Sequence, residues 1–579
     1  MKRLVLAGVA VIFLVASGSR GQETEREQVV GGLAFVDQVQ VTVVNIDVFV
    51  RDRNDRPVTG LKKEDFRLLQ DGQVRELSHF AAYDEEVLTA MLSPGAPSGG
   101  NESAGGDVAE QTPPGIADIQ PVHVVIYVDN ENIRPLDRNR VLAQVRHFVA
   151  EIMKPNVQVM VISVQRSAEI VTPFTNDPGE VEEGLRSMTR LYGAQVDRDR
   201  SRGRLIHDMQ AVQNDETSGG LRSDPAAADD LEERIRAYAE EIAMELGYSV
   251  NNLREILTTL AGLPGRKILV HVSSGLPAVP ARDLITWYGD LYQRTSSLPM
   301  LARYNRRQLI NSVASNANAQ GVTFYTIDVT GLAGDAAASA EYARPLDPIT
   351  SGIYVRNQQE PLLFLAESTG GRALVDSNDV TGLLEELRED LFTYYSLGYT
   401  LSTSGSDTLH RIEVEVPEHP EYKLLYRKTM VEKSIETQVQ NQVISGLMLA
   451  LDHNPMGIDL NTGVERPAME GRWIVPIEIR IPIESVALLP EVDDYVGQVV
   501  LFLANRDKKG RQSDMQRREF EIRMPSADYQ TRRNERYVAS FDLLFDEGEH
   551  DVVVGVLDPV TRQTSFATLR VSVPTTAKR

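Results

Sequence analysis

The pattern of apolar and polar positions changes twice along the chain and divides it into three parts. In residues 30–86, apolar and polar residues alternate between turn signals, as in half-buried β-strands. In residues 121–430, short apolar runs are followed by segments with helical periodicity, which predicts strands alternating with helices. Residues 431–579 return to alternation. We therefore predict a multidomain α/β plus all-β protein: a small Ig-like β domain, a doubly wound α/β domain and a C-terminal β-sandwich.

The middle part contains five predicted strands and five predicted helices. The strands are expected at residues 122–128, 158–164, 268–273, 323–328 and 372–375. The helices are expected at residues 135–153, 178–191, 231–260, 303–319 and 380–394. Polar stretches at residues 195–230 and 333–360 interrupt this alternation. We expect them to be exposed insertions, of the kind that often carries recognition.

The first residues and the composition indicate export. Lys2 and Arg3 precede an apolar run, so residues 1–22 are predicted to be a secretory signal peptide. No later apolar run is long enough to span a membrane. Residues 87–120, rich in Gly, Ser, Pro and Ala, are predicted to be a disordered linker. We expect a bacterial envelope protein, periplasmic or extracellular.

Charge and cysteine content narrow the classes of partner. The formal net charge of −23 argues against binding to nucleic acid or to anionic lipid. The chain has no cysteine, which rules out disulfides and thiolate metal sites. The glycine-rich nucleotide motifs, the H-E-x-x-H zinc motif and the G-x-S-x-G nucleophile motif are absent. Nothing in the sequence favours catalysis, and we predict that the protein is not an enzyme.

Four segments carry a resemblance to a known family. They are "IDVFVRDRNDRPVTGLKKEDFRLLQDGQVRELSHF", "LPGRKILVHVSSGLP", "NAQGVTFYTIDVTGL" and "LAESTGGRALVDSNDVTGLLEELREDLFTYYSLGYT". In this order they resemble the VWFA-related domain family best known from Acidobacteria, over residues 41–427. The resemblance implies a von Willebrand factor type A fold, with a ligand site at the top of its sheet, preceded by a small β domain. The C-terminal sandwich lies outside the resemblance.

The same resemblance identifies where a metal site would lie. Type A domains that bind ligands through Mg²⁺ use Asp-x-Ser-x-Ser after the first strand, a Thr from a later loop and an Asp from an Ile-Thr/Ser-Asp-Gly turn. Here Asp129 matches the first Asp, while Glu131 and Ile133 replace the two serines. Ser274 stands where the second Asp belongs, and no Thr occurs around residues 193–195. We therefore expect no cofactor; a weak Mg²⁺ or Ca²⁺ site at Asp129 and Glu131 is the alternative.

The turn after the first α/β strand has a second interpretation. Asn130, Glu131 or Asn132 is predicted to cap the helix that begins near Pro135, because side-chain oxygens satisfy free N–H groups at a helix start. A proline at that position suits the first helical turn.

These observations predict an exported, non-enzymatic protein-binding or scaffold protein whose type A domain has lost metal-dependent ligand binding. The expected partner is another protein, not nucleic acid and not a membrane. The alternatives are metal-dependent adhesion through Asp129 and Glu131, a hydrolase that uses these two carboxylates as acid and base, and a structural component of an envelope complex. The candidate partner-binding residues are Asn130, Asn132, Ser273 and Ser274.

Overall fold

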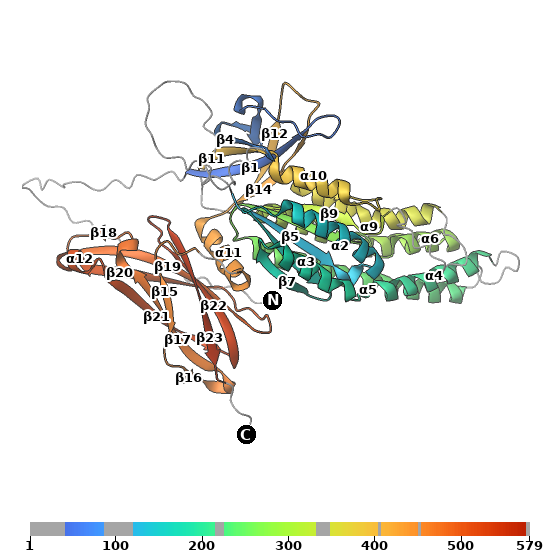
Figure 1. The fold of residues 1–579 in the computed structure, drawn as a ribbon. Helices are drawn as coiled ribbons and strands as arrows, with labels where there is room; N and C mark the ends of the chain where they lie inside the picture. Colours follow the sequence, from blue (N-terminus) through green and yellow to red (C-terminus); the bar gives the residue numbers. More distant parts are fainter. Residues whose placement is uncertain are drawn as a thin grey trace, which may run out of the picture. The chain divides into compact units, whose positions relative to one another are not determined.

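The computed structural model describes residues 41–85, 120–214, 225–331, 348–402, 407–449 and 453–574 (Figure 1). The predicted signal peptide and nearly all of the predicted linker lie outside these residues. Within them, no helix combines the length and the apolar character needed to cross a membrane. The parts of the chain are described below as an α/β domain, a split β domain and a C-terminal sandwich.

A six-stranded sheet with the order β10-β9-β8-β5-β6-β7 forms the centre of the α/β domain. All neighbours are parallel except β6 and β7, which form an antiparallel hairpin at one edge. The first strand therefore lies in the middle and the chain winds outward in both directions, as in doubly wound folds. The strands are β5 (Val122–Asp129), β6 (Val157–Val164), β7 (Ala168–Thr175), β8 (Arg266–Ser273), β9 (Val322–Asp328) and β10 (Ala373–Leu374).

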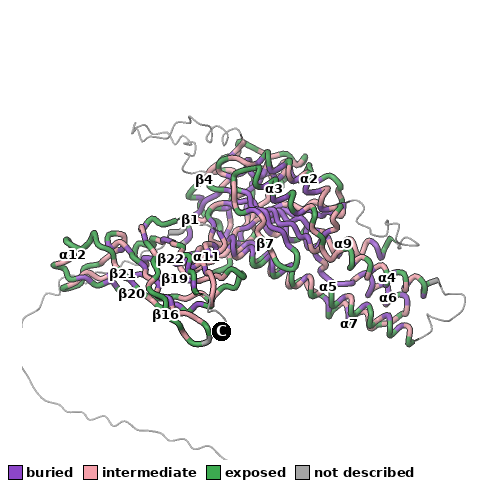
Figure 2. The backbone as a smooth tube through the Cα atoms, turned by 60° about the horizontal axis from the view of Figure 1, so that its bottom comes forward, coloured by how far each residue is buried: buried purple, intermediate pink, exposed green. Residues whose placement is uncertain are grey.

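Helices cover both faces of this sheet, which explains why its central strands are nearly continuous apolar runs. Every residue of β5 and β8 is buried. Figure 2 shows a group of buried backbone segments beside β7, in the interior of the α/β domain. One apolar core joins the sheet to α2 (Pro135–Ile152), α3 (Pro178–Ser187) and α10 (Thr381–Phe392). The other joins it to α5 (Pro225–Leu260), α8 (Arg307–Gln320) and α9 (Pro348–Thr369).

Part of the stretch predicted as an exposed insertion is a packed helix. α4 (Gln195–Asn214) joins α6 (Arg282–Tyr292), α7 (Ser297–Tyr304) and the first half of α5 around a separate apolar core. Leu205, Ile206, Met209 and Val212 supply its buried face. The same face continues through Arg198 and Arg202, which are also buried. Because these two charged residues interrupt the apolar pattern of the buried face, the sequence did not show helical periodicity here. The expectation of exposure at residues 195–214 was therefore wrong.

The first and last strands of the resemblance region fold together as one split β domain. β1 (Val41–Arg51) pairs antiparallel with β11 (Tyr394–Ser402), and β2 (Arg67–Gln70) pairs antiparallel with β12 (Thr408–Glu415). Two four-stranded sheets enclose a shared apolar core. The other strands are β3 (Gln73–Arg75), β4 (Leu77–Tyr83), β13 (Lys423–Leu425) and β14 (Thr429–Glu432).

This arrangement differs from the predicted boundaries. The sequence pattern predicts a β domain at residues 30–86 and an α/β domain that extends to residue 430. In the structure, residues 394–432 complete the β domain, so the α/β domain is inserted between β4 and β11. Strand pairing between segments more than 300 residues apart leaves no local signal in the sequence.

The C-terminal part begins with a helix, α11 (Ile435–Met448), which the sequence analysis did not predict. Its buried residues pack on one face of the sandwich. Two antiparallel sheets then enclose an apolar core. Their long strands are β17 (Trp473–Pro482), β19 (Asp494–Asp507), β20 (Gln516–Pro525), β21 (Arg536–Phe545), β22 (Gly548–Leu557) and β23 (Thr564–Val573).

A buried carboxylate, Asp390 at the end of α10, holds the split β domain and the α/β domain together. Its Oδ1 accepts a hydrogen bond from Arg51 Nη2 in β1 at 2.6 Å, and both side chains are 2% exposed. Its Oδ2 accepts from the Tyr325 hydroxyl at 2.7 Å and from Arg372 Nε at 3.1 Å. One carboxylate thus joins β1 and β9.

Replacing Arg51 with alanine is expected to lower the free energy of unfolding by about 3–5 kcal/mol, because Asp390 would lose a buried partner. Arg56→Ala is the matched control, since Arg56 pairs with Asp52 at an exposed site and its loss should cost about 1 kcal/mol or less. Urea unfolding of both variants measures the difference. Equal losses for the two would contradict the importance given to Asp390.

Candidate functional site

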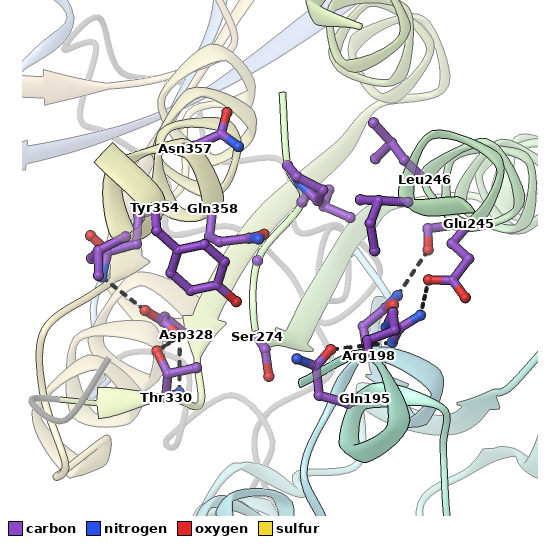
Figure 3. Close-up of a pocket in the computed structure, with 18 of the residues that line it drawn as sticks. Gln195, Arg198, Glu245, Leu246, Ser274, Asp328, Thr330, Tyr354, Asn357 and Gln358 are labelled. Carbon is purple, nitrogen blue, oxygen red and sulfur yellow. Dashed lines mark hydrogen bonds and ion pairs between the residues drawn. The ribbon is translucent and has the colours of Figure 1, made fainter. Parts of the chain in front are cut away.

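A crevice lies where the winding of the sheet reverses, at the carboxyl ends of β5 and β8. In doubly wound sheets this is the usual place for a ligand. The cavity has a volume of about 140 Å³. Its walls come from the turns after β5, β8 and β9, and from α4, α5 and α9. Figure 3 shows Gln195 and Arg198 on one side, Tyr354 and Asp328 on the other, and Ser274 between them.

Asp129, the last residue of β5, is 1% exposed and is not among the described residues that line the cavity. Its Oδ2 accepts hydrogen bonds from Asn132 Nδ2 at 2.7 Å and from the Ser273 hydroxyl at 3.3 Å. Its Oδ1 has no hydrogen-bond partner among the described residues. Burial raises the pKa of Asp129 to about 6, against the opposing effects of the Asn132 hydrogen bond and the Arg198 charge.

The turn after Asp129 does not cap the following helix. Residues Asn130–Asn132 form a short 3-10 helix, and the N-cap of α2 is Arg134, without a side-chain capping bond. The predicted capping by Asn130, Glu131 or Asn132 is therefore wrong. Instead, fully buried Asn130 donates to the Ser163 hydroxyl at 2.8 Å and accepts from the guanidinium of Arg138 at 3.2 Å.

Arg198 places a fixed positive charge beside this turn. Its guanidinium Nη2 donates to the Glu131 carbonyl at 2.6 Å and to Gln195 Oε1 at 3.2 Å, while Nη1 pairs with Glu245. The side chain is 5% exposed. An arginine cannot lose its proton in a protein, so the charge beside the backbone of this turn is permanent.

The turn after β8 is held in place by α9. Pro361 lies inside this helix and lacks the N–H that would bond the Asn357 carbonyl. That carbonyl accepts from Ala278 N–H at 3.3 Å instead, and the Asn357 side chain exchanges two hydrogen bonds with Val279. Gly275 has φ +110°, and a Cβ there would lie 2.6 Å from Gln358 Cβ. The carbonyl left free by Pro361 and this glycine together position Ser274 in the crevice wall.

The carboxylate at the end of β9 is fully engaged. Asp328 is 2% exposed. Its Oδ1 accepts from the backbone N–H and hydroxyl of Thr330, and its Oδ2 accepts from Gln359 Nε2 at 2.9 Å. Asp328 was not among the site residues predicted from the sequence. The signal that was missed is its position, because it is an acidic residue at the carboxyl end of a buried strand.

The charges of the crevice nearly cancel. Three arginines and four carboxylates line it, and several pair with one another or with close neighbours, as in Arg134–Asp199 at 2.6 Å and Arg202–Asp283 at 2.6 Å. Of the predicted partner-binding residues, Asn132 and Ser274 line the cavity, whereas Asn130 and Ser273 are buried. The lining also includes Gln358, which no sequence motif indicated.

These residues are a poor set of donors for a divalent cation. Ile133 is fully buried in the apolar core and has no donor atom. One Asp129 oxygen is already used by Asn132 and Ser273, and Arg198 adds a like charge beside the turn. Mg²⁺ requires near-octahedral oxygen coordination. Within the described parts of the chain, no group of three or more His, Asp or Glu side chains is arranged to hold a metal ion.

Acid–base catalysis by Asp129 and Glu131 is favoured by one feature and opposed by another. A carboxylate pKa raised to about 6 by burial suits a general acid. However, a catalytic acid must reach its substrate, and the side chain of Asp129 is 1% exposed and is held inward by Asn132 and Ser273. The geometry therefore favours a structural role for Asp129 over a catalytic one.

Comparison with known proteins finds similar solved structures only. No family model matches the chain, and no curated protein matches it. The vWF domain of the type V pili tip protein Mfa5 from Porphyromonas gingivalis is 11% identical, covers 47% of this chain and 95% of its own, and has a TM-score of 0.23. The conserved hypothetical protein BatB from Bacteroides thetaiotaomicron is 9% identical, with coverages of 47% and 98% and a TM-score of 0.18. The pilus adhesin SpaC from Lactobacillus rhamnosus GG is 8% identical, covers 74% of this chain and 52% of its own, and has a TM-score of 0.25.

The class of protein follows from the chain's own strand order. The sheet is doubly wound, begins at its centre and has one antiparallel edge strand, and β domains accompany it, which agrees with the fold expected of a type A domain. At the identities and TM-scores above, the likeness to solved structures adds no detail about function.

Asp129→Asn is expected to stabilise the protein at neutral pH. The folded state raises the pKa of Asp129 from 3.8 to about 6, so it retains a proton that the unfolded chain releases. Stability is therefore lost as the pH rises through this window, by up to about 3 kcal/mol. The asparagine variant avoids this loss. Its stability advantage over the wild type should be larger at pH 7.5 than at pH 4, as measured by urea unfolding, and a pH-independent difference would refute the argument.

Proposed function

We propose that this chain is an exported, non-enzymatic protein that binds a protein partner in the crevice of its type A-like domain without a metal ion. The proposal rests on one observation: the charged side chains of the crevice are largely paired with one another or with neighbouring residues, while polar groups such as the Ser274 hydroxyl and the Gln358 amide line its wall. A site of this kind selects by hydrogen bonding and shape more than by charge.

Two helices that line the crevice also carry exposed apolar side chains, which supports a protein as the ligand. Met244 and Tyr248 lie one helical turn apart on α5 and are 61% and 58% exposed. Leu136, near the start of α2, is 84% exposed. Large exposed apolar side chains that lie close together are typical of protein-binding surfaces.

The same proposal includes the family of the protein and its location outside the cytoplasm. The sequence motifs support membership of the VWFA-related family best known from Acidobacteria. Lys2 and Arg3 support removal of a signal peptide and a place in the periplasm or at the cell surface. A scaffold role in an envelope complex is the second form of the proposal. It differs from free binding by a fixed stoichiometry with the partner.

Blocking the crevice should abolish binding of the partner. A photo-crosslinking amino acid at Leu136 is expected to give one discrete adduct in the native envelope. Adding Gln358→Trp, which places a bulky ring in the cavity, should remove that adduct.

The control places the same crosslinker at exposed Gln498 in the C-terminal sandwich, where Gln358→Trp should change nothing. Circular dichroism of the Gln358→Trp protein checks that the fold is intact. An adduct at Leu136 that persists in the folded, blocked variant would exclude the crevice as the binding site.

Divalent cations are expected to stabilise the protein only slightly. A cation that binds the native state adds RT ln(1 + [L]/Kd), about 2.7 kcal/mol at a hundred times Kd but only about 0.4 kcal/mol when its concentration equals Kd. With Asp129 and Glu131 as the remaining donors, we expect millimolar Kd values and the smaller effect. Thermal unfolding with chelator, Mg²⁺, Ca²⁺ and Mn²⁺ tests this, with Asp129→Ala as the control. A large increase that the control abolishes would favour metal-dependent adhesion instead.

A further inference from the structure

A second cavity lies at the opposite, amino end of the α/β sheet. Its volume is about 120 Å³, and its walls come from the starts of β8 and β9, from the segment after α9, and from β1 and the β13–β14 segment of the split β domain. Lys267, in its wall, and Ser273, beside the crevice, are six residues apart on β8, so the two cavities are separated by about 20 Å. A cavity of this volume holds several water molecules, and therefore also a small polyatomic ion.

Two cations converge on this cavity. A Cβ placed on Gly321 would lie 3.0 Å from Arg427 Nη1 and 3.7 Å from Lys267 Cε, so both side chains reach the same point. The Lys267 ammonium group donates to the Leu263 carbonyl at 2.9 Å. Among the described residues, no carboxylate forms an ion pair with either side chain. Lys267 is 9% exposed and Arg427 is partly buried, and a charge that is removed from water is costly without such a partner.

The nearby negative charge compensates for only part of this excess, because the charge of Asp47 opposes the lowering of the Arg427 pKa by burial without reversing it. Asp47, the carboxylate that lines the cavity, already pairs with Arg266 at 3.1 Å. Lys433 adds a further positive charge, and its ammonium group donates to Gln320 Oε1 at 2.5 Å. Burial, together with the charges of Arg427 and Lys433, lowers the pKa of Lys267 to about 7. The cavity is therefore lined by cations that repel one another.

We propose that this cavity binds a tetrahedral oxyanion, such as phosphate or sulfate, through Arg427 and Lys267. An arginine fork and a lysine ammonium are the groups that proteins use for such anions. The anion would supply the missing negative charge between the two side chains. Because Arg427 belongs to the split β domain and Lys267 to the α/β domain, a bound anion would also link these two domains.

The test is calorimetric titration of the whole protein with sodium phosphate and sodium sulfate, with sodium chloride at matched ionic strength as the reference. Saturable binding of either oxyanion is expected, and none of chloride. Arg427→Met and Lys267→Met should each weaken the Kd by at least about tenfold, since each removes a charge-assisted contact. Lys428→Met is the matched control, because Lys428 is exposed and pairs with Glu367, and its Kd should equal that of the wild type.

A second readout needs no variant. An anion beside Lys267 should restore its proton, so sulfate binding near pH 7.5 should take up protons, seen as a heat that depends on the ionisation enthalpy of the buffer. Sulfate does not itself titrate there. Saturable binding of sulfate without proton uptake, binding that both methionine variants retain, or no saturable binding at all would each overturn the proposal. A preference for phosphate over sulfate would support it and indicate a hydrogen bond from the ligand to Asp47.

Discussion

The carboxylate of Asp390 is the constraint on which the arrangement of the split β domain and the α/β domain depends. It accepts hydrogen bonds from Arg51, Arg372 and Tyr325, which belong to the first strand of the split β domain, the segment before β10, and β9. A buried carboxylate is costly without such partners, so the three donors must meet at one point. Because β11 begins four residues later, the same contact fixes where the chain re-enters the β domain. The carboxyl end of the α/β domain is thereby joined to β1 of the split β domain.

Helix α5 determines where the crevice lies. Its second half packs on the sheet through Leu246, Val250 and Leu253, whereas its first half packs against α4 and α6 through Leu231 and Ile235. One helix of 36 residues therefore serves two apolar cores. The crevice lies where these cores meet, and its lining from α5 comes from the middle of the helix. Arg198 lies on α4 and lines the crevice. This helix therefore contributes both part of the crevice wall and the fixed positive charge.

The sequence predicted those features whose cause is local. Apolar runs located β5, β6, β8 and β9, and the proline at position 135 located the start of α2. The split β domain escaped prediction because β1 and β11 pair across the whole α/β domain. The helix α4 escaped because arginines occupy its buried face. At the site, position in the motif selected Asn132 and Ser274, but Gln358 and Asp328 come from segments that only the fold brings together.

The two cavities at opposite ends of the sheet differ in how their charge is balanced, and this difference predicts what each selects. In the crevice, arginines and carboxylates neutralise one another, so a charged ligand would gain little Coulomb energy and would first have to displace existing pairs. At the amino end, Lys267 and Arg427 form no ion pair with any carboxylate in the described part of the chain, and a ligand that carries negative charge would relieve their repulsion. The family resemblance predicts an ion site at the carboxyl end of the sheet. The unpaired charges of this chain favour ion binding at the opposite, amino end of the sheet. Because these charges are positive, they favour an anion instead of a metal cation.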